Sequence, residues 1–203
     1  MKRLIFVTII FIVTTFLPVL RQTGPCLAAD THQHGGMGTH SMGGTGPILD
    51  FILTSQDNRP VSLRDFKGKV VLINFIYASC KETCPILIKK FLEVQDAMKT
   101  RLGKDIILLS ITIDPERDTP PILKEYARKM GAGTKGWFFL TGKPQEVDRV
   151  LKDYGVYYEK GQDGRIGHIN LIILIDRKGN RQNFGGFSYP KEMLLSAINE
   201  ALR

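Results

Sequence analysis

The sequence predicts an α/β fold in which a mixed central sheet is flanked by helices. Two segments, 70–76 and 105–113, are continuous runs of mostly apolar residues, as in strands that are buried on both faces of a sheet. A segment with helical spacing follows each of them, and such alternation is typical of parallel strands joined by helices. With 203 residues, of which 43% are hydrophobic, the chain is long enough for one such domain with additional segments.

The first 29 residues have the pattern of an export signal. Lys2 and Arg3 precede an apolar run at Leu4–Leu20, and small residues suited to cleavage follow. The run is short for a membrane span, which favours a cleaved signal peptide over an uncleaved N-terminal anchor. Either alternative places the domain outside the cytoplasm, secreted into the periplasm or anchored in the inner membrane, with the leader as the only membrane contact. Cys26 stands in a poor context for lipidation.

Residues 30–46 form a tail that is rich in glycine, histidine and methionine. This segment has almost nothing apolar to bury, and it is therefore expected to be disordered. Imidazole and thioether groups are neutral ligands that copper accepts, although a flexible linker of accidental composition is an equally good explanation. The candidate ligands are His32, His34, His40, Met37 and Met42.

The folded domain is expected to span residues 47–203. An edge strand is predicted near 48–53 and a turn at Asn58–Pro60. The buried strand Val70–Ile76 runs into a turn, and a helix opens near Thr83 and continues to Gly103. Pro85 suits the first turn of that helix, because its missing N–H costs nothing there.

The later elements continue the alternation and end in a hairpin and a helix. Asp118 or Thr119 is the predicted N-cap of the helix that prolines 120 and 121 begin. His168 is expected to open a strand beside the cysteine-bearing strand. The other predicted elements are a strand at 137–140, a helix at 144–154, an inserted hairpin at 156–164, a strand at 169–175, its hairpin partner at 181–184 and a closing helix at 190–202. This order is the thioredoxin-like plan, with an N-terminal strand extension and an inserted hairpin.

Cys80 and Cys84 lie where the first central strand becomes a helix. They are the only cysteines outside the leader, so they form a single dithiol rather than a disulfide framework. A helix N-terminus carries partial positive charge and free N–H groups, and Lys81 adds a positive charge. We therefore expect these thiols to be more acidic than a free thiol. In open α/β sheets the chemistry lies at the carboxyl ends of the strands, where this turn falls.

Three roles for the dithiol remain open at this point. A structural disulfide across so short a loop would stabilise the fold little. Thiol–disulfide exchange is favoured by the positive charge near the cysteines, which stabilises a reactive thiolate, but redox thioredoxins have two residues between their cysteines and a cis-proline before the facing strand. Here three residues intervene, and no proline lies between Pro144 and Pro190. The third role is a metal site, because two thiolates and a neutral imidazole suit Cu(I), and His168 is the only histidine after the tail.

Several of these features together resemble the Sco (SenC) family. They are Cys80-x-x-x-Cys84-Pro, the sequence Asp-Pro-Glu-Arg-Asp-Thr-Pro at 114–120, and His168 before a hydrophobic strand that ends in Leu-Ile-Asp-Arg-Lys-Gly. The resemblance covers roughly 47–203 and implies a thioredoxin-like copper protein outside the inner membrane. It implies that Cys80, Cys84 and His168 bind copper, for which Cu(I) is the expected state and Cu(II) the alternative.

The same resemblance implies a function and a partner. Family members deliver copper to the binuclear copper site of cytochrome c oxidase, or keep the cysteines of that site reduced. The implied partner is therefore the copper-site subunit of the oxidase or another copper protein. The alternative is a thiol–disulfide oxidoreductase that uses Cys80 and Cys84 without a stable metal. No other catalytic residue is assigned.

The charge of the chain argues against a nucleic-acid partner. The formal net charge is +8, from 28 basic and 20 acidic residues. The basic residues are scattered, without a long run and without interleaved aromatic residues, as on an ordinary solvated surface.

Overall fold

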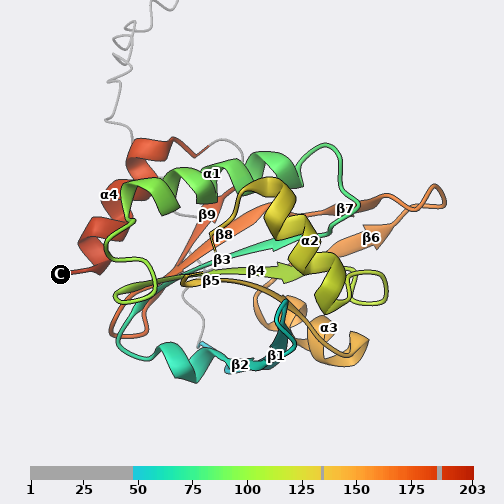
Figure 1. Cartoon of the computed structure of the whole chain (residues 1–203), viewed down its shortest axis with the longest axis horizontal. Coiled ribbons are helices and arrows are strands. Elements are labelled where there is room, and N and C mark those ends of the chain that lie inside the picture. Colours follow the sequence, from blue (N-terminus) through green and yellow to red (C-terminus); the bar gives the residue numbers. More distant parts are fainter. Residues whose placement is uncertain (1–47, 134, 187–188) are drawn as a thin grey trace, which may run out of the picture. The chain divides into compact units, whose positions relative to one another are not determined.

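A seven-stranded mixed sheet forms the centre of the domain (Figure 1). The computed structural model describes residues 48–133, 135–186 and 189–203, so the predicted leader (1–29) and the tail (30–46) lie outside the described residues. The strand order is β2-β1-β5-β4-β3-β8-β9. In the described part of the chain, no helix has the length and apolar character needed to cross a membrane.

The middle of the sheet is parallel and fully buried. All residues of β3 (Val70–Ile76) and β4 (Ile106–Thr112) are buried, and the two strands pair in parallel from Val70 opposite Ile106 to Ile76 opposite Thr112. β5 (Trp137–Thr141) pairs in parallel with the far side of β4. On the other side of β3, β8 (Leu171–Ile175) and then β9 (Arg181–Gly185) pair antiparallel. This mixed sheet with its helices confirms the predicted fold class.

Helices cover both faces of the sheet. α1 (Cys84–Ala97) and α4 (Lys191–Ala201) contact each other on one face, and α3 (Pro144–Asp153) lies on the opposite face (Figure 1). α2 (Pro120–Met130) packs against β5. Each of the first three helices begins at or next to a proline, as predicted.

The first helix ends earlier than the sequence suggested. α1 stops at Ala97, and Gly103 instead forms a tight turn before β4 with a φ of +81°. A positive φ is readily adopted by glycine, and a glycine at such a turn imitates the signal of a helix C-terminus. The helix end was therefore predicted six residues too late.

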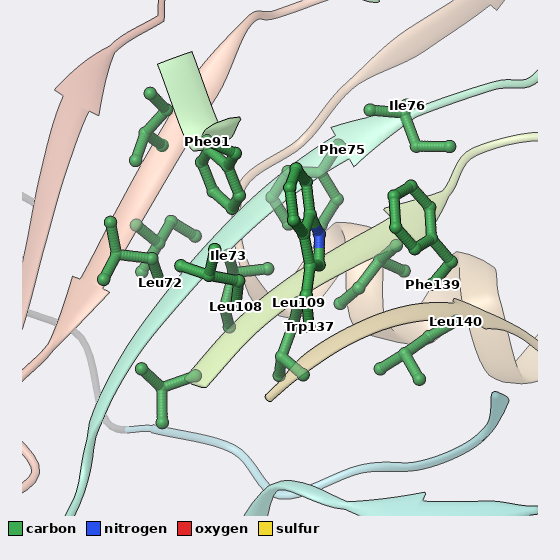
Figure 2. Packing of buried hydrophobic residues seen from close by; sticks show 14 of the residues in the cluster. Leu72, Ile73, Phe75, Ile76, Phe91, Leu108, Leu109, Trp137, Phe139 and Leu140 are labelled. Carbon is green, nitrogen blue, oxygen red and sulfur yellow. The ribbon is translucent and has the colours of Figure 1, made fainter. Parts of the chain in front are cut away.

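An aromatic cluster holds α1 against the parallel strands (Figure 2). The ring of Phe91 from α1 lies 5.8 Å from that of Trp137, which stacks on Phe139 at 5.3 Å. The buried indole N–H of Trp137 donates to the hydroxyl of Ser110 at 3.0 Å, so its one polar group is satisfied. This packing fixes α1, and therefore Cys84 at its first position, over the carboxyl ends of the strands.

The N-terminal extension is a short hairpin at the sheet edge. β1 (Ile52–Ser55) pairs with β2 (Pro60–Ser62) and with β5, and a 3-10 helix follows at Leu63–Phe66. The strand starts later than predicted, and Pro60 belongs to β2 rather than to the turn. Pro60 is tolerated there because it begins an edge strand.

The predicted inserted hairpin is present as a separate two-stranded sheet. It comprises β6 (Tyr158–Lys160) and β7 (Ile166–His168), with Tyr158 opposite His168. His168 therefore ends a hairpin strand, and the prediction that it opens the next strand of the main sheet was wrong. β8 does lie beside β3, as predicted, but it begins at Leu171.

Candidate metal centre

The two cysteines lie at the junction between β3 and α1. Cys80 is in the turn before the helix, and Cys84 is the first helical residue. The backbone N–H of Cys84 donates to Sγ of Cys80 at 3.3 Å, and the hydroxyl oxygen of Thr83 lies 3.5 Å from the same sulfur. Both cysteines are free thiols in this structure. The sulfur of Cys80 thus occupies a position where the free N–H groups of the helix stabilise a thiolate.

The pKa values of the two thiols shift in opposite directions. A hydrogen bond with Cys84 holds the pKa of the Cys80 thiol well below its usual range, with further help from Thr83 and from backbone N–H groups. The same hydrogen bond, followed by burial, raises the pKa of the Cys84 thiol. The arrangement favours one thiolate at Cys80 with the proton retained on Cys84.

His168 presents an unpaired nitrogen at the end of the hairpin. Its Nδ1 lies 3.1 Å from the carbonyl oxygen of Ile169, so a protonated Nδ1 donates there and Nε2 keeps a free lone pair. Nε2 is buried and has no hydrogen-bond partner among the described residues. Burial also lowers the pKa of His168, which favours the neutral imidazole. A buried nitrogen of this kind suits a metal ligand whose other nitrogen is fixed by a hydrogen bond.

A cleft of about 580 Å³ brings the cysteine loop and the hairpin together. Cys80 and His168 both line it, whereas the fully buried Cys84 does not. In the part of the chain that the structure describes, no three His, Cys, Asp or Glu side chains are grouped closely enough to hold a metal ion. The predicted residues therefore share one region, but they do not form a ready-made cluster of three ligands.

Tyr77 connects the two halves of the cleft. It follows β3 directly, and its ring packs edge-on against the imidazole of His168, with 6.2 Å between the ring centres. Its hydroxyl oxygen accepts a long hydrogen bond of 3.4 Å from the backbone N–H of Ile166 in β7. No sequence pattern pointed to a role for Tyr77. Its position just before the cysteine motif was the only available signal.

The buried carboxylate of Asp118 holds the backbone of the cysteine loop by a hydrogen bond. Asp118 accepts hydrogen bonds from the backbone N–H of Ala78 at 3.0 Å and from the hydroxyl of Thr112 at 2.5 Å. The N-cap was predicted at Asp118 or Thr119, and the structure has it at Thr119, without a side-chain capping bond. Asp118 instead fixes the backbone two residues before Cys80.

Sequence comparisons support a single family. A profile of the family described as SCO1/SenC matches residues 44–203. The chain is similar to the protein SenC of Rhodobacter capsulatus, with 35% identity over 167 residues that cover 80% of this chain and 72% of that protein. It is also similar to the mitochondrial SCO1 homolog of Mus musculus, with 29% identity over 86% of this chain. The chain spans only 61% of the mouse protein, and 46% of a 28% identical SCO1 homolog from Arabidopsis thaliana that matches 75% of this chain.

Solved structures show the same fold. Bradyrhizobium japonicum ScoI, solved with copper bound, has a TM-score of 0.66 and 30% identity, over 77% of this chain and 99% of ScoI. BsSco, described as a member of the Sco family of cytochrome c oxidase assembly proteins with a disulfide switch, has a TM-score of 0.68 and 26% identity. That match covers 78% of this chain and 94% of BsSco. The chain belongs to the SCO1/SenC family.

Proposed function

We propose that this protein is an extracytoplasmic copper chaperone. It holds copper through Cys80, Cys84 and His168, and it delivers the metal to the binuclear copper site of cytochrome c oxidase or keeps the thiols of that site reduced. The observation that most supports this proposal is the buried Nε2 of His168, which has no hydrogen-bond partner in the described part of the chain and belongs to a residue that lines the same cleft as Cys80. The export pattern of residues 1–29 supports the location.

The donor set suits copper as a transferable cargo. Thiolate sulfurs and a neutral imidazole are ligands that Cu(I) prefers, and a site with few ligands can pass its ion on by ligand exchange. We expect the cysteine loop or the hairpin to adjust on binding, because the three donors are not grouped in the structure. Cys84 must lose a proton that its environment retains, so copper affinity should fall as the pH falls.

Oxidation of the dithiol would release the metal. Formation of a Cys80–Cys84 disulfide removes two thiolate ligands and transfers two electrons to an oxidant such as a protein disulfide, which becomes two thiols. Copper occupancy would therefore depend on redox state. The histidines and methionines of residues 30–46 would gather copper near the site at a raised local concentration.

A second candidate function is thiol–disulfide exchange without a metal. The arrangement of the cysteines favours it, because an acidic Cys80 lines the cleft and a protonated Cys84 lies behind it. The Cys80 thiolate would attack a disulfide of the partner to form a mixed disulfide. Cys84 would then displace the partner sulfur, which leaves as the second of two thiols.

Competition with a chromophoric Cu(I) chelator tests the chaperone proposal. The reduced chain is compared with its His168→Ala variant under anaerobic conditions, both without residues 31–44, so that the tail does not contribute. We expect one tightly bound Cu(I) in the parent and an affinity lower by 10-fold or more in the variant, since one ligand of three is lost. Circular dichroism checks that the fold is retained.

The same preparation separates the two candidate functions. Equal affinity in the parent and in His168→Ala would remove His168 from the site. Rapid turnover with a disulfide substrate, together with no retained copper, would instead favour the oxidoreductase.

A further inference from the structure

Charged contacts join the β6–β7 hairpin to the segment between β4 and α2. Nζ of Lys160 lies 3.1 Å from a carboxylate oxygen of Glu116 and 3.6 Å from one of Asp114. From the same segment, Arg117 donates through Nη2 to the carbonyl oxygen of Gly164 at the hairpin turn, at 3.2 Å. Segment 114–118 therefore contacts both the strand β6 and the turn of the hairpin that carries His168.

Asp114 is the buried centre of these contacts. Its side chain is only 2% exposed, and it is paired with Nε of Arg117 as well as with Lys160. A carboxylate that is withdrawn from water needs charged or hydrogen-bonding partners, and the loss of one partner is costly. The Lys160 contact thus differs from an ordinary surface ion pair, because one of its two carboxylates is inaccessible to solvent.

The same segment also holds the cysteine loop. Asp118 accepts from the backbone N–H of Ala78, and the hydroxyl of Thr112 both donates to Asp118 and accepts from the backbone N–H of Asp114 at 2.9 Å. One continuous network therefore runs from the residues before Cys80 to the hairpin. It bridges the two parts of the chain that would have to supply sulfur and nitrogen ligands.

We propose that Lys160 and Arg117, through the carboxylate of Asp114, are positioning residues that hold the His168 hairpin against the cysteine loop. The link to copper rests on the proposed function, whereas the link to hairpin position does not. Among the described residues, no hydrogen bond or ion pair joins Lys160 or Arg117 to a cysteine or to His168, so they act through the backbone of the hairpin. The carboxylates of Asp114 and Asp118 give segment 114–118 one attachment to each half of the cleft.

Hydrogen exchange of the reduced, metal-free full-length chain tests the position of the hairpin. Lys160→Met removes the ammonium group and keeps the length of the side chain. We expect the amides of β6 and β7 to exchange about 3- to 10-fold faster, the scale of one lost partly buried ion pair. Lys160→Arg should restore slow exchange. Lys178→Met removes an equal charge from the exposed turn between β8 and β9, at the other end of the sheet, and should have no effect.

The salt dependence of hairpin exchange is a second measurement, and it distinguishes the loss of an ion pair from the loss of packing. Ion pairs are screened by salt. Raising the salt concentration should therefore speed exchange of the hairpin in the parent and in Lys178→Met, and should have less effect in Lys160→Met. Equal exchange rates for the hairpin in the parent and Lys160→Met would overturn the proposal.

Copper titration of the same variants separates this proposal from the proposed function. We expect Lys160→Met to bind Cu(I) about 3- to 10-fold more weakly than Lys178→Met, with recovery in Lys160→Arg. If Lys160→Met speeds exchange of the hairpin while His168→Ala keeps full copper affinity, the positioning role is supported and His168 is removed from the metal site. If exchange of the hairpin is unchanged in Lys160→Met while His168→Ala binds copper weakly, only the positioning role is overturned.

Discussion

At the scale of single residues, Cys80 and Cys84 are chemically unequal although they are only four positions apart. Cys80 lies in a turn where a helix N–H and a hydroxyl surround its sulfur, whereas Cys84 is buried beneath it. Burial favours the protonated thiol, and hydrogen bonds to sulfur favour the thiolate. The pair is therefore expected to react first at Cys80, whether the incoming group is an electrophile, a disulfide or a metal ion.

Alkylation at mildly acidic pH measures this inequality. At pH 6, where an ordinary thiol is almost fully protonated, iodoacetamide should modify Cys80 well before Cys84, as read by peptide mass spectrometry. Cys84→Ala removes the neighbouring donor, so it should raise the pKa of Cys80 and slow its alkylation at that pH. Cys84→Ser keeps a donor and should retain faster alkylation than the alanine variant. Equal rates at both cysteines in the parent would contradict the account.

The residues of the site differ in how far they could be predicted. A strand, a turn and a proline located Cys80 and Cys84 at the junction, because these are local signals. The role of Asp118 could not be predicted, because its partner Ala78 lies 40 positions away and only the parallel pairing of β3 with β4 brings them together. A local capping role was the best available interpretation of such an aspartate.

At the scale of elements, the boundary of the hairpin shows how pairing overrides a local pattern. His168 precedes an apolar run, which suggested that it opened the strand. Instead it pairs with Tyr158, and β8 begins three residues later. Strand pairing between distant residues decides such boundaries, whereas the apolar pattern only indicates that a strand is nearby.

A close contact between two glycines fixes the start of the parallel strands. Gly136 has a φ of +78°. A Cβ atom at this position would collide with the backbone N of Gly103 and would lie only 2.5 Å from the Cα of Gly103. Gly136→Ala should therefore lower the free energy of unfolding by about 3 kcal/mol, through strain and overpacking. Gly155→Ala has a similar φ of +74° but open space around it, so it should cost only about 1 kcal/mol.

Urea unfolding of the reduced variants gives both values. The comparison isolates the steric contact, because both substitutions place an alanine at a positive φ. If Gly136→Ala lowers the free energy of unfolding no more than Gly155→Ala does, the turns at Gly103 and Gly136 can move apart easily, and the close packing of these turns is contradicted.

At the scale of the whole molecule, the fold was more predictable than the site. The mostly apolar β3 and β4 are typical of a covered parallel sheet, and their alternation with helices predicted the α/β fold class. The site depends on which loops meet at one end of the sheet. Tyr77, Asp114 and Lys160 gave no local signal of that meeting, because their contacts join segments that are far apart in sequence.

We propose that sulfur and nitrogen donors from two separate segments bind the same copper ion. X-ray absorption spectroscopy of the reduced chain without residues 31–44, loaded with one equivalent of Cu(I), reports the ligand atoms directly. We expect two sulfur ligands and one imidazole nitrogen, with the nitrogen contribution lost in His168→Ala. A spectrum with sulfur ligands alone, identical in the parent and the variant, would contradict this proposal.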